Sequence, residues 1–496
     1  MAHKTLDVRD PAAVGALAQD ELERGCDLLG LLVFRNMLKD DTAQAIAELK
    51  RGGTRTVMIT GDTALTGVFI ARQCGMVPPG SRVLLGECAA PGDDVQWVDV
   101  DTKEPVADIG PRLAAAGPDG FPATELAVGG AAFESLCKTG AIDALLFHVR
   151  VFARMKPTHK VECVERHMRH GVTAMCGDGG NDCGALRAAH VGIALSDAEA
   201  SIVSPFSSAD RSVMACVELL RQGRAGLATS FANFAALICY GQIMGISLKM
   251  VSFYFAISLT QNLWMLVDGA IATALMLTIS MSGPARRLAP QRPTSRILGP
   301  QMLAAVGGTV LINFAFMALA YVWLFRQDWF RCNEHATAEV DVTKWWLLGD
   351  NYEASVLSFV ATFQFINNGM VVNFGYRFRA AWYRNYALLA VSGFLVAFVS
   401  AMLLADPNRV GCAFRLNCGD PSALAALGYA APSWRIEPYN NLLGHNVIPR
   451  DSRYRLWGLC LGNMAAANAW QVLVVNGPVR SLLRARFPLR RLRCKL

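Results

Sequence analysis

The stretch Ala174-Met175-Cys176-Gly177-Asp178-Gly179-Gly180-Asn181-Asp182 decides how the first part of the chain folds. The apolar run at residues 172–175 is typical of a buried strand, and the segment that starts at Cys183 favours a helix. A strand that ends in a glycine-rich turn and passes into a helix predicts a parallel sheet with helices on both faces. Because ligands of such sheets bind at the carboxyl ends of the strands, we expect the chemistry at this turn.

Two carboxylates, Asp178 and Asp182, lie in this turn. Carboxylate oxygens are suited to holding Mg²⁺, and the glycines beside them let a phosphate approach the backbone. The alternative is an acidic turn that only caps the following helix. Polar residues at the ends of other predicted strands favour a magnesium site.

The same pattern recurs upstream. Residues 56–59 form a second apolar run, which ends in Thr60-Gly61-Asp62, and residues 152–160, with Arg154 and Lys160, precede an amphipathic helix. A hydroxyl group and an ammonium group beside a metal-holding aspartate pair would neutralise a transferring phosphoryl group. The sequence therefore predicts a phosphoryl-transfer site built from these strand ends. Between Pro78 and Gly130 the chain is rich in Gly, Pro and Asp, and we expect an irregular insertion or a pair of edge strands there.

The composition of the 496 residues indicates a second part of a different kind. Hydrophobic residues make up 53% of the chain and charged residues only 18%, against about 25% in an ordinary globular domain. This excludes a disordered or fibrous protein and indicates that lipid solvates part of the chain. From residue 227 onward, apolar stretches of roughly 20 residues recur, which is the length that crosses a bilayer as a helix. They predict six transmembrane helices, near residues 229–253, 262–281, 301–325, 354–373, 386–404 and 456–475.

Arginines set the predicted orientation of these helices. They follow the second and the fourth apolar stretch and fill the tail at residues 480–496, and the whole chain has a net charge of +7. Because cytoplasmic flanks are rich in Lys and Arg, we predict that the soluble first part and the C-terminus are cytoplasmic. The tail is either a flank that only orients the last helix or a site for anionic lipid head groups. We expect no nucleic-acid partner, because the basic residues lie at membrane ends and do not interleave with aromatic residues.

Asp268 is the ionisable residue nearest the middle of a predicted span. A carboxylate there costs about 2.5–3.5 kcal/mol on insertion scales, so it marks a candidate functional site, and a cationic substrate would offset the cost. The alternative is a structural hydrogen-bond network between helices. Nearby polar candidates for substrate binding are Tyr240, Gln242, Gln261 and Asn262. For Gln364, Asn367, Asn368 and Asn373 of the fourth span we expect a packing role.

Two groups of cysteine and histidine residues allow other chemistry. His159, Cys163, His167 and His170 recur at near-helical spacing and are of types that bind zinc. A single helix seldom supplies all ligands of a tetrahedral site, and the charged residues between them favour a solvated amphipathic helix. Cys412 and Cys418 lie on the predicted non-cytoplasmic side, where a disulfide between them is compatible with the oxidising surroundings.

Taken together, these motifs resemble the C-terminal half of a P-type ATPase. The combination is most similar to the B branch of type V P-type ATPases, the polyamine transporters. The residues that carry the resemblance are 56–62, 151–155, 174–178, 181–186, 198–201, 204–206, 223–225 and 292–293.

The resemblance implies an α/β, haloacid-dehalogenase-like phosphorylation domain with a Rossmann-like parallel sheet at residues 1–226. It implies an all-α transmembrane domain with six helices at 227–479 and a basic cytoplasmic tail at 480–496. The cofactors would be ATP and Mg²⁺, and the transported substrate would be a cation, with a polyamine favoured. The membrane would be endolysosomal or another internal membrane.

The resemblance also implies roles for single residues. Thr60 and Lys160 would contact the phosphoryl group, and Asp178 and Asp182 would hold the metal. Asn181 and Asp182 would complete the catalytic shell, and Gly61, Asp62 and Arg154 would line the nucleotide and phosphate side. Asp268 matches the acidic position in the sixth helix of the full transporter.

The chain departs from the family pattern at three places. Thr63 replaces the usual Asn and Gly180 the usual Ala, and neither change removes chemistry. The phosphorylated aspartate followed by Lys-Thr-Gly-Thr is absent, and Lys138-Thr139-Gly140 follows Cys137, whose thiol does not form an acyl phosphate. We therefore expect a fragment, a truncated gene model or a decayed relative that alone does not hydrolyse ATP by this mechanism. The alternatives are a transporter of metal ions or protons and a catalytically inactive membrane scaffold.

Overall fold

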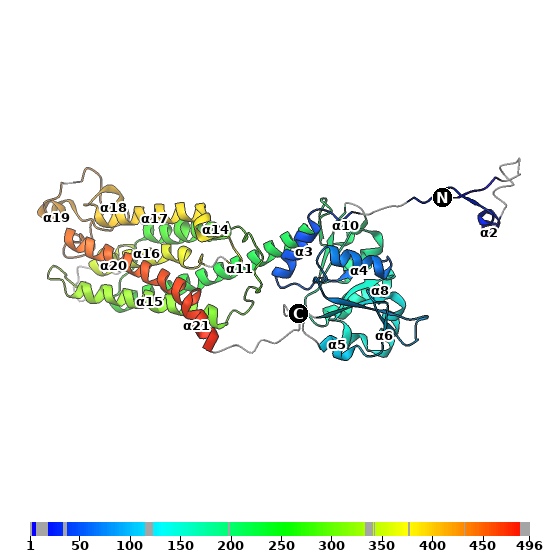
Figure 1. Cartoon of the computed structure of the whole chain (residues 1–496). Coiled ribbons are helices and arrows are strands. Elements are labelled where there is room, and N and C mark those ends of the chain that lie inside the picture. The colour runs from blue at the N-terminus through cyan, green and yellow to red at the C-terminus, as the bar shows by residue number, and fades with distance from the viewer. Residues whose placement is uncertain are drawn as a thin grey trace.

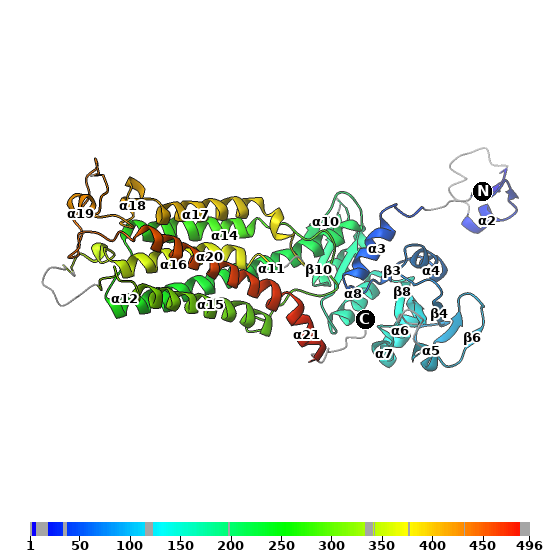
Figure 2. The same ribbon diagram turned by 60° about the vertical axis from the view of Figure 1, so that its left-hand side comes forward.

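In the computed structural model of the chain, β-sheets and short helices form a domain at one end and long helices form a bundle at the other (Figure 1). Helix α11 (Met214–Gln242) leaves the sheet domain and continues into the bundle (Figure 2). We call the end of the bundle next to the sheet domain the near end and the opposite end the far end. A small antiparallel pair, β1 (Ala2–His3) and β2 (Asp27–Leu28), lies apart with α2 (Gln19–Glu23). The structure describes residues 2–5, 18–32, 37–114, 123–196, 199–332, 341, 343–374, 377–430 and 432–486.

The larger sheet is mainly parallel. Its strands lie in the order β3-β8-β7-β4-β5-β6. The first four run parallel to one another, and β5 and β6 are antiparallel at one edge. The bounds are β3 (Met58–Ile59), β8 (Val149–Ala153), β7 (Thr124–Gly129), β4 (Arg82–Glu87), β5 (Gln96–Asp99) and β6 (Pro105–Val106).

The prediction for residues 78–130 is wrong in part. Strands β4 and β7 of this segment lie inside the sheet, and β7 pairs with β8 on one side and β4 on the other. The strands β5 and β6 are the predicted pair of edge strands. The short buried runs of β4 and β7 lie between turns rich in Gly, Pro and Asp. The composition averaged over the segment is therefore that of turns and does not indicate these strands.

Helices cover both faces of the larger sheet because successive strand residues point to opposite faces. On β7, Leu126 and Val128 pack with α6, α7 and α8, whereas Ala127 packs with α4. Helix α6 ends at Gly140, whose φ of 75° favours glycine. The bounds are α3 (Thr42–Arg51), α4 (Ala64–Gln73), α5 (Gly110–Ala114), α6 (Gly130–Thr139), α7 (Ile142–Leu145) and α8 (Pro157–Met168).

A second, three-stranded parallel sheet has the order β11-β10-β9. Its outer strand β9 and the outer strand β3 of the larger sheet form no ladder with each other among the described residues. Ile59 of β3 nevertheless packs against the apolar clusters of both sheets, so the two edges are close neighbours. The bounds are β9 (Ala174–Gly177), η1 (Gly180–Asp182), α9 (Cys183–Ala188), β10 (Val191–Ala194), α10 (Glu199–Val203) and β11 (Phe206–Ser207).

The bundle confirms the predicted number of membrane helices. Among the described residues, six helical stretches are long and apolar enough to cross a membrane. The fourth is surrounded by the others, and even its polar side chains are buried. The six stretches are Met214–Phe255, Gln261–Ser280, Pro300–Phe325, Tyr352–Val371, Tyr386–Leu404 and Arg450–Leu483.

Three of these spans contain a π-helical segment within the part of the chain that the structure describes. A π-helix widens the helix locally and is found frequently at functional sites. The segments are η2 (Ile243–Leu248), η3 (Met265–Ala272) and η6 (Trp470–Val475). The α-helical parts are α11, α12 (Lys249–Phe255), α13 (Gln261–Trp264), α14 (Thr273–Ser280), α15 (Pro300–Phe325), α16 (Tyr352–Val371), α17 (Tyr386–Leu404) and α20 (Arg450–Ala469).

The loops at the far end form a folded cap. It contains α18 (Arg409–Ala413) and α19 (Pro421–Ala426), and Cys412 and Cys418 form the predicted disulfide. At the near end, α21 (Pro478–Arg486) follows the sixth span at an angle (Figure 1).

Candidate functional site

The turn after β3 presents Thr60 and Asp62. The backbone N–H of Thr60 donates a hydrogen bond to Phe152 O (2.8 Å), which holds the turn on the neighbouring strand. Thr60 Oγ1 accepts a hydrogen bond from Asp62 N and donates one to Asp62 Oδ2, both at 3.1 Å. Thr63 Oγ1 accepts a hydrogen bond from Thr66 N and caps α4, so Thr63 fills a position that Asn would fill equally well.

The turn after β8 is bound to the turn after β3. Arg154 N donates to Asp62 O (2.9 Å), and Met155 N donates to Thr60 O (3.0 Å). Arg154 has a φ of 52°, and its side chain is exposed at the carboxyl edge of the sheet. A Cβ atom at Gly130 would lie 2.4 Å from Arg154 O, so only glycine permits this close approach.

Lys160 and Asp182 form an ion pair between α8 and η1. Lys160 Nζ lies 2.7 Å from Asp182 Oδ1, and the two side chains are 11% and 13% exposed. Partial shielding from water strengthens such a pair. The side chain of Asp182 folds back over the end of β9 and lies directly against Gly177. A Cβ atom at Gly177 would lie 2.6 Å from Asp182 Oδ2, which is too close for any side chain at this position. This arrangement therefore requires glycine at position 177.

Asp178 and Asn181 are exposed beside this ion pair. The carboxylates of Asp178 and Asp182 are oxygen donors of the kind that Mg²⁺ prefers. The described residues contain no group of three or more His, Cys, Asp and Glu side chains that could hold a metal ion. The two aspartates therefore fit part of a magnesium site, whose other ligands would be phosphate, water or a further residue.

The predicted residues of the sheet domain thus form two groups. One lies at the ends of β3 and β8, and the other lies at the end of β9 and the start of α8. Within the described parts of the chain, no hydrogen bond or ion pair joins the side chains of the two groups. The first group is Thr60, Gly61, Asp62 and Arg154, and the second is Lys160, Asp178, Asn181 and Asp182.

In the bundle, the structure brings Asp268 and Tyr240 together. Asp268 lies in η3 and accepts a hydrogen bond from the hydroxyl group of Tyr240 in α11. The side chain of Asp268 is exposed on the outside of the bundle. A small cavity beside Tyr240 is also lined by Asn368, whose side-chain nitrogen is buried without a hydrogen-bond partner among the described residues. This nitrogen therefore makes none of the interhelix bonds expected of a packing residue.

The other polar candidates lie elsewhere. Gln242 lines a second small cavity with Ser247 and Asn313. Gln261 is exposed at the start of α13, and Asn262 Nδ2 donates to Ala413 O (2.7 Å) in the far-end cap. None of the three is hydrogen-bonded to Asp268 in the described structure.

Buried amides join the third, fourth and sixth spans. Gln364 Nε2 donates to Asn313 O (2.9 Å), and Asn463 Nδ2 donates to Asn313 Oδ1 (3.2 Å). Asn367 Oδ1 accepts a hydrogen bond (2.9 Å) from an asparagine of the sixth span. The packing prediction is confirmed for Gln364 and Asn367, whereas the side-chain amide of Asn373 is buried and has no hydrogen-bond partner among the described residues. Sequence reasoning missed Asn313 and Asn463, although a lone Asn in an apolar stretch is the signal for such a bond.

Of the four cysteine and histidine residues that resemble zinc ligands, Cys163 is buried in α8, His159 and His167 are half-buried in the same helix, and His170 is exposed beyond its end. Cys163 is fully buried, and burial raises the pKa of its thiol. His167 Nδ1 lies 2.8 Å from Cys163 O, and burial lowers the pKa of this histidine. His159 lies 3.8 Å from the carboxylate of Glu134. These contacts give the residues structural partners.

The Lys138-Thr139-Gly140 sequence ends α6, as its predicted helical context requires. Burial raises the pKa of the preceding Cys137 thiol to about 12. Neither feature is typical of a phosphorylated strand end.

Comparison with known proteins gives relatives of one kind. The chain is 29% identical over 462 residues to the human polyamine-transporting ATPase 13A3, with 84% of this chain and 37% of that protein aligned. It is 34% identical over 440 residues to the mouse probable cation-transporting ATPase 13A5, with 80% and 35% aligned. It is 34% identical over 408 residues to the mouse polyamine-transporting ATPase 13A2, with 79% and 34% aligned. No protein-family model matches the chain.

The chain spans little more than a third of the length of these relatives. With its six candidate spans, this similarity indicates a multi-pass membrane protein. The homologues of this chain are P-type ATPases of the 13A type, which transport polyamines or other cations.

Proposed function

We propose that this chain is the phosphoryl-transfer and membrane-spanning part of an ATP-driven cation transporter, with a polyamine as the favoured cargo. The observation that carries the proposal is the pairing of Lys160 with Asp182 beside Asp178, next to the bound turn of Thr60 and Arg154. This set of groups is suited to phosphoryl transfer. The proposed division is a haloacid-dehalogenase-like domain at residues 1–226, a membrane domain at 227–479 and a tail at 480–496.

Each side chain has a role in this proposal. Lys160 and Thr60 neutralise and orient the phosphoryl group of ATP. Arg154, Asp62 and Gly61 line its nucleotide side, where the backbone leaves open space. Asp178 and Asp182 would hold Mg²⁺, with Asn181 beside them, and the metal would supply charge stabilisation to the transferring group.

In the residues that the structure describes, the outer edges of β3 and β9 pair with no further strand, and this supports a position for the phosphorylated aspartate. Both strands are short, partly exposed and close to each other, and both end in site residues. A parallel strand between them would join the two sheets and end beside Thr60 and Asp178. We propose that the phosphorylated carboxylate stands at the end of such a strand, supplied by a segment of the kind that makes the relatives longer.

The transport site of the proposal is centred on Asp268. Its carboxylate lies within a candidate span, is exposed and accepts a hydrogen bond from the hydroxyl group of Tyr240, and a carboxylate in a span is a candidate site for a cation. An exposed charge at this depth also requires cover from further helices or protein. A polyamine carries amine groups that such a carboxylate binds, and a metal ion or proton is the alternative cargo.

Arginine-rich flanks support a cytoplasmic sheet domain and C-terminus. The basic helix α21 follows the sixth span, and its arginines would meet anionic lipid head groups at this surface. The proposed location is an endolysosomal or other internal membrane.

The test is phosphoenzyme formation by the product of the complete transcript that contains this chain. With radiolabelled ATP and Mg²⁺ we expect a hydroxylamine-sensitive acyl phosphate, which spermine makes turn over faster. The Lys160→Met variant is expected to lose most of the phosphoenzyme, whereas Lys156→Met, an exposed lysine of the same segment, retains it. Absence of any phosphoenzyme would favour the inactive scaffold, and turnover stimulated by metal ions or protons but not by spermine would favour the alternative cargo.

A further inference from the structure

Seven residues of the far-end cap, from Cys412 to Cys418, form a ring that their disulfide closes. We call it the disulfide ring. Two of its residues, Arg415 (φ 54°) and Asn417 (φ 56°), have a left-handed backbone. Residues other than glycine adopt this conformation only where surrounding contacts enforce it. Leu416 between them is buried in the apolar core of the bundle.

Asn417 connects the disulfide ring to the fifth and sixth spans. Its Nδ2 donates to Ala405 O (2.9 Å) at the end of α17, and its Oδ1 accepts from Ile448 N (3.1 Å) just before α20. Asn446, on the same approach to α20, donates to Arg415 O (2.7 Å). The ring is therefore attached to both neighbouring helix ends.

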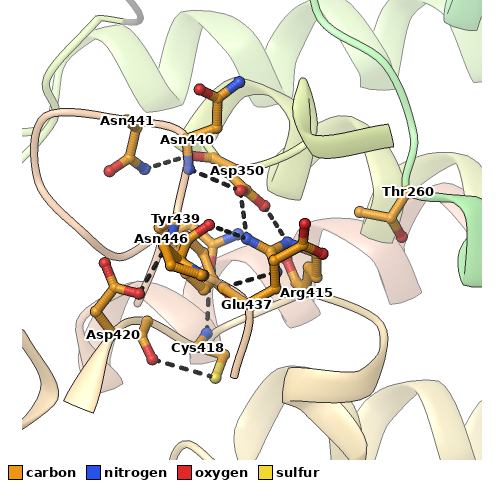
Figure 3. A network of polar contacts seen from close by, with 12 residues as sticks. Thr260, Asp350, Arg415, Cys418, Asp420, Glu437, Tyr439, Asn440, Asn441 and Asn446 are labelled. Carbon is orange, nitrogen blue, oxygen red and sulfur yellow. Dashed lines mark hydrogen bonds and ion pairs between the residues drawn. The ribbon is translucent and has the colours of Figure 1, made fainter. Parts of the chain in front are cut away.

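Arg415 connects the disulfide ring to the fourth span, and Figure 3 shows it at the centre of a polar network. Arg415 Nε donates to Asp350 Oδ1 (2.6 Å), just before α16, and the Asp350 side chain is 1% exposed. The guanidinium carbon lies 4.4 Å from the ring centroid of Tyr439. Asn440 N donates to Asp350 Oδ2 (3.0 Å), and Arg415 Nη1 donates to Glu437 O (3.1 Å). These bonds satisfy a buried charge pair on several sides.

Two carbonyl groups of the disulfide ring reach the second span. Thr260 Oγ1 donates to Phe414 O (2.9 Å), and Asn262 Nδ2 donates to Ala413 O (2.7 Å). Thr260 is also the N-cap residue of α13, and its carbonyl oxygen accepts from Trp264 N (3.1 Å). The ring therefore holds the first turn of the span that carries Asp268.

We propose that the disulfide ring is a positioning element for Asp268. The carboxylate lies in η3, directly after α13, and a π-helical segment can change to α by a slip of one residue. Such a slip turns the following side chains by roughly 100° about the helix axis. By fixing Thr260 and Asn262 against three other spans, the ring sets the height and rotation at which Asp268 meets Tyr240. The inference takes the cation-binding role of Asp268 from the proposed function.

The test compares Thr260→Val with Thr260→Ser in the full chain in lipid nanodiscs. Valine has the shape of threonine but lacks the hydroxyl group that bonds to Phe414 O, and serine keeps it. Dicyclohexylcarbodiimide modifies carboxyl groups in apolar surroundings, so its rate of reaction at Asp268, measured by peptide mass spectrometry, reports the surroundings of this carboxyl group. We expect Thr260→Val to change the rate by about threefold or more, the effect of one hydrogen bond, and Thr260→Ser to keep the wild-type rate.

Reduction of the disulfide between Cys412 and Cys418 provides a second way to test whether the disulfide ring affects the reaction rate at Asp268. The two thiols of dithiothreitol convert the disulfide to two cysteine thiols and form a cyclic disulfide themselves. We expect reduction, and the double variant Cys412→Ser and Cys418→Ser without reductant, to change the rate as Thr260→Val does. Cys332→Ser, at an exposed cysteine of the same end, serves as the control and should keep the wild-type rate.

The inference is overturned if Thr260→Val and the reduced protein react at the wild-type rate. It is also overturned if Thr260→Ser changes the rate as Thr260→Val does and both variants lower the thermal unfolding midpoint equally. The change in rate would then come from lost stability and not from the lost hydrogen bond. Spermine separates this inference from the proposed cargo. If spermine fails to slow the reaction of the wild-type chain while Thr260→Val changes the rate, the cargo is wrong and the positioning role stands.

Discussion

Gly177 shows that the position of a proposed phosphoryl-transfer residue depends on the absence of a single carbon atom. The Asp182 carboxylate occupies the space where a side chain at Gly177 would begin, and from there it reaches Lys160. The ion pair between Asp182 and Lys160 therefore depends on the absence of a side chain at Gly177. In the bundle, the contact to Asp268 is the hydrogen bond that its carboxylate accepts from Tyr240.

We predict that Gly177→Ala displaces Asp182 and breaks its pair with Lys160. The added methyl group overlaps the carboxylate, and overpacking of this kind costs about 1–3 kcal/mol. The measurement is the thermal unfolding midpoint of the full chain in detergent, together with amide hydrogen exchange in α8. Gly171→Ala, at a glycine with open space around it, is the matched control and should behave as wild type. Equal behaviour of the two variants would contradict the prediction.

His167 makes the stability of the sheet domain depend on pH. Burial lowers its pKa below the ordinary value of 6.5, so the unfolded chain binds a proton more readily than the folded chain. Its contribution to stability is therefore present above 6.5 and is lost as the pH falls toward the lowered pKa. We expect the unfolding midpoint to fall between about pH 7.5 and about pH 5.5, and to fall less in His167→Gln. His3→Gln, at an exposed histidine, should leave the fall unchanged.

Among the helices and strands, the elements that carry site residues are short. Contacts at their ends hold the site residues in place. Strand β3 is brief, and the turn after it is held by hydrogen bonds to β8 and by the cap of α4. Within the described parts of the chain, β3 and β9 are outer strands, and each has one edge that pairs with no other strand. An edge of this kind is a template for another strand.

We predict that Thr63→Ala loosens the first turn of α4 and thereby the turn of Thr60. Loss of a side-chain cap costs about 0.5–2 kcal/mol. Amide hydrogen exchange in the first turn of α4 should become faster, and Thr63→Asn should keep the wild-type rate because asparagine caps equally well. A wild-type exchange rate in Thr63→Ala would show that the cap is not needed.

For the chain as a whole, the bundle and the sheet domain meet at the near end, where α21 presents an apolar side. Val479, Leu482 and Leu483 are 38%, 69% and 54% exposed, whereas Arg480 donates a hydrogen bond (2.7 Å) to Gln301 in the third span. An amphipathic basic helix that directly follows a membrane span is suited to the membrane surface. The exposed leucines would then lie among lipid chains and the arginines among anionic head groups.

We predict that α21 binds the membrane surface more tightly when anionic lipid is present. A bimane label on Leu482→Cys should emit at shorter wavelength in nanodiscs that contain phosphatidylserine than in nanodiscs of phosphatidylcholine alone. The signal of the unsubstituted chain, labelled in the same way, is subtracted. The label on Ser481→Cys, at an exposed position of the other side of the helix, should emit as in water. Equal emission from both positions in both lipids would contradict the prediction.

Local sequence was sufficient for the features that depend on neighbouring residues. The glycine-rich turn at 177–182 and the Thr60 turn were found because each site residue follows its own strand directly. The six spans were found because the thickness of a bilayer sets the length of an apolar helix. The disulfide of Cys412 and Cys418 also joins residues that are close in sequence.

Contacts between distant residues could not be obtained in this way. The interior places of β4 and β7, the buried bonds of Asn313, and the attachment of the disulfide ring to Thr260 and Asp350 all join segments that are far apart in the chain. A pattern of residue types records which side chains avoid water and where a turn can form. It does not record which partner each buried polar group finds, because that choice depends on how the helices and strands pack and on which hydrogen bonds the packed structure leaves to be satisfied.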